Sequence, residues 1–145
     1  MDFNLDCELL LDVISKKEVV LLYVSNICEN QHTILKQGLS QDNKKLFYEM
    51  GNAKQEYIDK IQKYDIVFER VFARVAQYLE KEKEKADIKE LIRKIQFKIS
   101  KVTNYDTAIR AWEKENTKLI ENIYKTKSEA KSPFIQVNNM PNIKF

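Results

Sequence analysis

Few residues in this chain could bind a metal ion or act as a nucleophile: it has one histidine and two cysteines. Glu29 stands three positions before His32, which gives one Glu-x-x-His pair, but a di-iron bundle needs that motif twice on inward faces. Cys7 and Cys28 have neither Cys-x-x-Cys spacing nor a nearby partner ligand. We therefore expect no metal and no cofactor, a structural or solvent-facing histidine, and two reduced, partly buried thiols.

Motifs for phosphate binding and for hydrolysis are also missing from the sequence. Two isolated glycines cannot form a glycine-rich phosphate loop, and no Gly-x-Ser-x-Gly sequence occurs. The long apolar stripes described below leave little sequence from which to build a shaped pocket. We expect a protein that is not an enzyme.

The charged residues are balanced in number and mixed along the chain. There are 25 Lys and Arg against 22 Asp and Glu, whereas a nucleic-acid-binding protein would gather its cations on one face. The longest apolar run, Val19–Val24, is far too short to cross a bilayer, and the first residues are acidic where a signal peptide would be basic. We expect a cytoplasmic protein with no nucleic-acid partner and no membrane insertion.

The composition predicts an all-α fold. Strands need frequent turn residues, but the chain has two Gly and two Pro, and Pro133 and Pro141 both lie near its end. Apolar residues spaced by three and four predict long helices at about 5–37, 42–82 and 87–127, packed as an antiparallel coiled-coil-like bundle in one domain, 1–127. For residues 128–145 we expect a flexible or loosely docked, irregular tail.

Polar residues interrupt the apolar stripes of the first two predicted helices. Lys17 and Gln31 interrupt the first stripe, and Lys54 is the polar member of the second, which keeps a heptad rhythm over Phe47–Tyr78. Gly38 suits the left-handed end of the first helix. The residues able to cap the next helix are Ser40, Asp42 and Asn43.

The second helix is expected to end in the charged run Glu80–Lys85. Continuing the apolar stripe through this run would bury Glu and Lys side chains. Asp87 with Glu90 three residues later has the spacing of a capping box, with Asp as the cap. We therefore predict a turn near Lys83–Asp87. The alternative is one unbroken helix through both segments, because Glu, Lys and Ala are strong helix formers.

The apolar stripe of the third predicted helix changes at Val102. Beyond this residue the same positions hold Asp106, Glu113 and Asn116. The apolar residues move to a neighbouring stripe, so the first half of the helix is typical of a bundle and the second half less so. That neighbouring stripe contains Tyr105, Ile109, Trp112, Leu119 and Ile123, with Tyr124 nearby.

The order of these segments resembles that of FlgN-type flagellar export chaperones, small helical proteins of the flagellar type III secretion system. The resemblance lies in Glu18–Leu22 of the first helix, Lys54–Tyr57 of the second and Glu113–Asn116 of the third. It covers most of residues 5–125 and does not extend to the tail.

The resemblance implies a protein that binds other proteins and catalyses no reaction. Such chaperones bind the C-terminal helices of hook-associated (filament-junction) proteins, prevent their premature assembly and deliver them to the export gate. Their cargo surface lies towards the C-terminal part, which agrees with the change of stripe in the third helix. Recognition would place a cargo helix in a groove, with Trp112 as the main anchor. The predicted protein-binding residues are Tyr105, Ile109, Trp112, Asn116, Leu119, Ile123 and Tyr124.

Three alternatives fit the same sequence. A structural coiled-coil homodimer or adaptor without an export cargo would use the unfilled helix face for self-association. Another secretion or phage-encoded helical adaptor would bind through the same kind of apolar helix surface but would carry a different cargo. An enzyme or metal-binding bundle would contain bound metal after purification.

Overall fold

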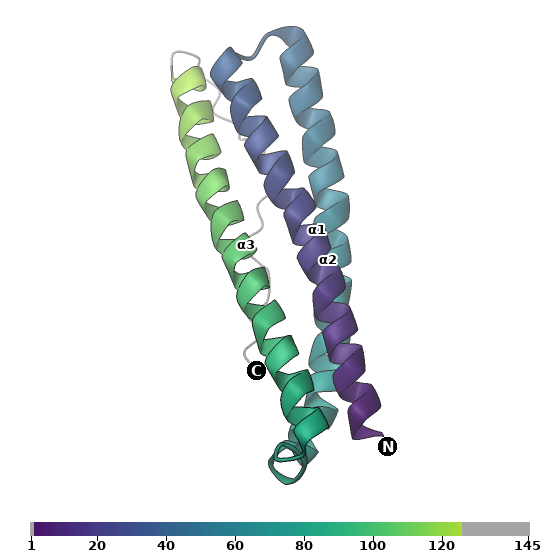
Figure 1. Ribbon diagram of the computed structural model, residues 1–145. Coiled ribbons are helices and arrows are strands. Elements are labelled where there is room, and N and C mark those ends of the chain that lie inside the picture. Colours follow the sequence, from purple (N-terminus) through teal and green to yellow (C-terminus); the bar gives the residue numbers. More distant parts are fainter. Residues whose placement is uncertain (1, 126–145) are drawn as a thin grey trace.

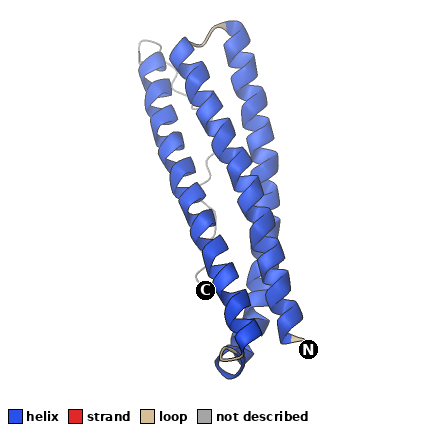
Figure 2. Cartoon of the chain, viewed as in Figure 1, coloured by secondary structure: helices blue, strands red, loops and turns tan. Residues whose placement is uncertain are grey.

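Three long α-helices make up the described part of the chain. The computed structural model describes residues 2–125, which form α1 (Phe3–Gln37), α2 (Gln41–Glu82) and α3 (Ala86–Tyr124) (Figure 1). Two short connections join them (Figure 2). The all-α prediction and the break between the second and third helices are confirmed. The predicted tail, residues 128–145, and the last positions predicted for the third helix lie outside the described residues.

Polar groups at both helix ends hold the connection between α1 and α2. Gly38 has φ 96° and ψ 155°, a positive-φ backbone that favours glycine, although not the left-handed helical conformation expected there. Ser40 is the cap that α2 uses, since its Oγ accepts a hydrogen bond from the Asn43 N–H at 3.2 Å. Asn43 Nδ2 donates to the Gly38 carbonyl at 2.8 Å. The turn therefore reverses the chain with its polar groups satisfied.

The connection between α2 and α3 lacks the predicted capping box. The cap position of α3 is Lys85, which forms no side-chain cap. Asp87 lies inside the first turn, accepts from the Ile88 N–H at 3.0 Å and accepts from Asn4 Nδ2 of α1 at 2.9 Å. Glu90 pairs with Arg93 instead of reaching back to the cap. The prediction was wrong because it ignored α1, whose first turn lies beside this connection.

Helix α1 packs along both other helices, which approach each other much less closely. Because the chain reverses at each connection, α1 and α3 run in the same direction and α2 runs opposite to both (Figure 1). This arrangement buries an apolar stripe of each helix. None of the helices within residues 2–125 is long and apolar enough to cross a membrane.

The apolar core is divided into two clusters along the bundle. The main cluster runs from Cys7 to Cys28 of α1 and takes in Ile58–Val75 of α2 and Ile95–Ile109 of α3. The second cluster lies at the end of the bundle near the α1–α2 connection, and its buried members are Ile34, Leu35, Phe47 and Ile120. The gap between the two clusters falls at the level of α3 where the candidate site begins.

Candidate functional site

The seven predicted protein-binding residues fall into two groups by burial. Ile109 and Asn116 have no exposed surface, so they could contact a partner only if the bundle opened. The other five are half-buried: Tyr105 and Trp112 pack against the main cluster, and Leu119, Ile123 and Tyr124 pack against the second.

The change of stripe in α3 does not turn the polar residues away from the bundle. Glu113 and Asn116 are 6 % and 0 % exposed, so the helix keeps the same face inward past Val102. The interpretation of the polar positions as a change of face is wrong for these two residues. The physical reason is that both meet polar partners on the other helices, and a buried polar group is tolerated when it is hydrogen-bonded.

Lys54 connects all three helices through the bundle interior. Its ammonium donates to Glu113 Oε1 of α3 at 2.5 Å and to Gln31 Oε1 of α1 at 3.0 Å, and its side chain has no exposed surface. The Cys28 thiol donates to the same Glu113 oxygen at 3.1 Å. Gln31 Nε2 donates to the Phe47 carbonyl at 3.4 Å. The Lys54–Glu113 ion pair is thus embedded in a network of charge-assisted hydrogen bonds.

Asn116 extends the network to the edge of the bundle. Its Nδ2 donates to the Cys28 carbonyl at 3.0 Å, and its Oδ1 lies 3.0 Å from Nδ1 of His32. An amide oxygen only accepts, so His32 Nδ1 carries the proton in this arrangement. The His32 ring is also 5.0 Å from the Trp112 ring, centre to centre. The lone histidine therefore has a structural role that positions the predicted anchor.

These side chains form a polar layer between the two apolar clusters. We define the polar layer as Gln31, His32, Lys54, Glu113 and Asn116. Such a layer favours one register, because sliding any helix by a turn would leave a buried charge or amide unpaired.

A second buried ion pair lies deeper in the main cluster. Lys17 Nζ of α1 donates to Asp65 Oδ1 of α2 at 2.5 Å, with both side chains buried. The other carboxylate oxygen of Asp65 has no hydrogen-bond partner within residues 2–125. Burial raises the pKa of Asp65, with further upward contributions from Glu69 and Asp106, while Lys17 opposes the shift. Glu113 of the first pair likewise has one buried carboxylate oxygen, Oε2, without a hydrogen-bond partner within residues 2–125.

Cys28, which is hydrogen-bonded to Glu113 of the polar layer, is a possible nucleophile, but its surroundings disfavour reaction. Burial strongly raises the pKa of the Cys28 thiol, so the thiol stays protonated and a poor nucleophile. No group of three or more His, Cys, Asp or Glu side chains within residues 2–125 is placed to hold a metal ion. The arrangement is suited to holding three helices in register.

One flank of α3 keeps accessible apolar surface beside the polar layer. Tyr105, Trp112 and Leu119 are spaced by seven residues and Ile123 follows at the next turn, so they lie on one side of the helix. All four are half-buried. We call these four residues the aromatic row. It retains most of the predicted protein-binding surface. Tyr124 lies elsewhere on α3, with Lys44 of α2 5.9 Å from its ring centre.

Sequence reasoning found the members of the polar layer but missed that they meet. Gln31 and Lys54 were identified as interruptions of their stripes, and Glu113 and Asn116 as the end of a third stripe. The usable signal was position: Lys54 and Glu113 lie almost equally far along the chain before and after the turn at Lys83–Lys85. Antiparallel helices joined there must place them side by side.

Comparisons with protein-family models, with curated proteins and with solved structures gave no match for this chain. The resemblance to FlgN-type export chaperones therefore stays a prediction, and the three-helix bundle with its polar layer is what is established.

Proposed function

We propose that this protein is a cytoplasmic, non-catalytic chaperone of the FlgN type, which binds the C-terminal helices of hook-associated proteins, prevents their premature assembly and delivers them to the export gate. The proposal is supported most directly by the aromatic row on α3. A cargo helix with apolar residues at i, i+3, i+4 and i+7 would lie along this row and complete the burial of its half-exposed side chains.

The polar layer supports the proposal by fixing the anchor of the row. Trp112 packs on His32, and His32 hydrogen-bonds to Asn116. Asn116 in turn donates a hydrogen bond to the backbone of α1 at Cys28. A large aromatic side chain held in one orientation loses little entropy on binding, and such residues dominate helix interfaces. Trp112 is therefore the residue whose loss should weaken cargo binding most.

The test is co-purification from the native cell, comparing the wild type with a chain that carries Trp112→Ala and Leu119→Ala. The proposal expects a hook-associated protein to be recovered with the wild type and lost with the double variant. A matched control carries Ile66→Ala and Val67→Ala, two exposed apolar residues on α2, and should retain the partner. Circular dichroism of all three proteins checks that the helices are kept.

The rival function is a structural homodimer or adaptor without an export cargo, which uses the aromatic row for self-association. It predicts that the only protein recovered is a second copy of the chain, and that Trp112→Ala with Leu119→Ala abolishes this self-association. That result would overturn the chaperone proposal.

A further inference from the structure

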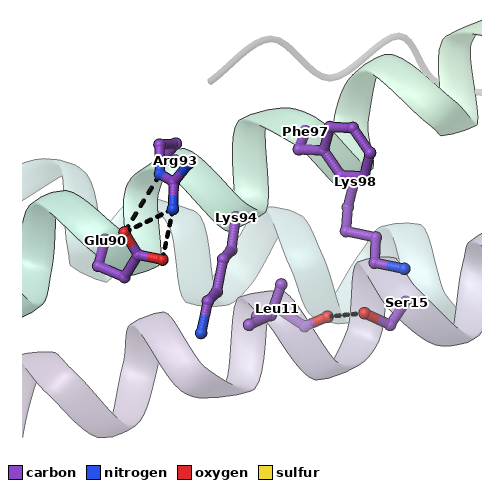
Figure 3. Close-up of a pocket in the computed structure, with 7 residues that line it drawn as sticks. All are labelled: Leu11, Ser15, Glu90, Arg93, Lys94, Phe97 and Lys98. Atoms are coloured by element: carbon purple, nitrogen blue, oxygen red, sulfur yellow. Dashed lines mark hydrogen bonds and ion pairs between the residues drawn. The ribbon is translucent and has the colours of Figure 1, made fainter.

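A cavity of about 480 Å³ opens between α1 and the first half of α3 (Figure 3). Phe97 at its edge is 60 % exposed, an unusual position for a large aromatic side chain. Phe97 lies fifteen positions before Trp112, which corresponds to roughly 22 Å along the helix. We call this cavity the Phe97 groove; its lining residues are Leu11, Ser15, Glu90, Arg93, Lys94, Phe97 and Lys98.

The rim of the Phe97 groove carries a surplus of positive charge. Arg93 is neutralised by Glu90, and Lys98 by Glu18 of α1. Lys94 extends from α3 towards α1 (Figure 3) and forms no ion pair within residues 2–125. Lys101 adds a further cation, 5.3 Å from the centre of the Phe97 ring. An apolar groove with this rim fits a helix that combines apolar side chains with carboxylates.

The start of α1 is such a helix. Leu5 is 60 % exposed and Leu9 37 % exposed, and the exposed carboxylates of Glu8 and Asp12 lie on the same side at spacings of three and four. The sequence before Lys16 contains no Lys or Arg. Lys16 itself pairs with Asp12 at 2.9 Å, so Glu8 is the carboxylate of this face that no ion pair within residues 2–125 neutralises. We call Leu5, Glu8, Leu9 and Asp12 the acidic ridge.

The acidic ridge and the Phe97 groove lie next to each other on one molecule. Leu11 and Ser15 line the groove and belong to the same turns of α1 as the ridge. A surface that carries both halves of a complementary pair can bind a second copy through two identical contacts related by a two-fold axis.

We propose that two copies of this chain form a symmetric dimer in which the acidic ridge of each copy lies in the Phe97 groove of the other. Leu5 and Leu9 pack on Phe97, while Glu8 faces Lys94. The dimer leaves the aromatic row uncovered, so this inference does not depend on the proposed chaperone function.

The test is sedimentation equilibrium of the full-length chain over a concentration series, where the mass should rise from 17.2 kDa towards twice that value. Phe97→Ser should raise the dissociation constant at least about tenfold. Ile66→Ser, which removes an exposed apolar residue of α2, should leave it unchanged. Circular dichroism should be the same for all, because the substituted residues are exposed.

Charge reversal tests the pairing itself. Glu8→Lys and Lys94→Glu should each weaken the dimer, and both changes in one chain should restore it, because each two-fold contact then has its charges exchanged. Lys114→Glu, at an exposed position farther along α3, is the control and should have no effect.

A mass of 17.2 kDa at every concentration would overturn the inference. So would a dimer that is insensitive to Phe97→Ser, or one that the combined charge reversal fails to restore. The Trp112→Ala, Leu119→Ala chain should remain a dimer here, so failure of this proposal and failure of the chaperone proposal give different results.

Discussion

Lys54 of α2 and Glu113 of α3 meet at 2.5 Å although α2 and α3 otherwise approach each other little. Their ion pair joins these two helices in the interior, and Gln31 ties it to α1. The pair therefore closes the bundle where apolar packing between α2 and α3 is sparse.

Removing one partner of this pair should be strongly destabilising. Lys54→Ala leaves Glu113 buried without its cation and should lower the free energy of unfolding by about 3–5 kcal/mol. Replacing both, with Lys54→Met and Glu113→Leu, should be neutral or stabilising by about 1–4 kcal/mol. Urea denaturation of the single and double variants measures both effects. A double variant that loses as much stability as Lys54→Ala would show that the two residues do not act as a pair.

Asp65 should make stability depend on pH in the direction opposite to an ordinary salt-bridged carboxylate. Its pKa is raised in the folded state, chiefly by burial, so the folded protein holds the proton more tightly than the unfolded chain. The stability contributed by Asp65 is then present below about pH 4, the unfolded pKa, and is lost as pH rises through the folded pKa.

The measurement is the unfolding free energy between acid and neutral pH for the wild type and for Asp65→Asn. The wild type should lose stability relative to the variant as pH rises above about 4. A wild type that gains stability relative to Asp65→Asn over this range would mean that Lys17 outweighs burial.

Both cysteines should resist thiol reagents in the folded protein. Cys7 and Cys28 have no exposed surface, and burial raises the pKa of Cys7 to about 11, so neither access nor thiolate is available near neutral pH. We expect modification by a disulfide reagent to follow the rate of unfolding and to be complete in denaturant. Rapid modification of either thiol without denaturant would contradict the closed interior described above.

The end of the bundle beyond the polar layer should open more easily than its middle. The second cluster is small and is separated from the main cluster by polar side chains. Amide hydrogens of residues 117–124 should therefore exchange faster than those of 58–75 in the free protein. Cargo binding along the aromatic row should slow the exchange of 117–124. Equal exchange rates for the amide hydrogens of both segments in the free chain would contradict this prediction.

The three helices and the connection between α1 and α2 could be predicted from the sequence because they depend on local chemistry. Stripes at a spacing of three and four, a cap among Ser40, Asp42 and Asn43, and a glycine at position 38 are properties of neighbouring residues. The turn between α2 and α3 could also be predicted, since extending the stripe would have buried the charges of Glu80–Lys85.

The candidate site was harder to predict because its members are distant in sequence. Asn116 was predicted to bind a partner protein, yet its amide group hydrogen-bonds to the Cys28 carbonyl and to His32 of α1. Asp87 likewise matched a local capping rule but bonds Asn4. Whether a polar residue is buried depends on whether a hydrogen-bonding partner lies opposite it on another helix. That partner cannot be identified until the register of the helices is known.

Helix α1 is made first during synthesis, yet it is the helix on which both others pack. The α1–α2 hairpin can close soon after residue 82 is available, because its two helices adjoin in sequence. The parallel pairing of α1 with α3 joins residues such as Glu18 and Lys98, which are separated by 80 positions, and closing so long a loop slows folding. A nascent chain would thus present one uncovered side of α1 until α3 is nearly complete, and this interval is when misassembly with other chains is most favoured.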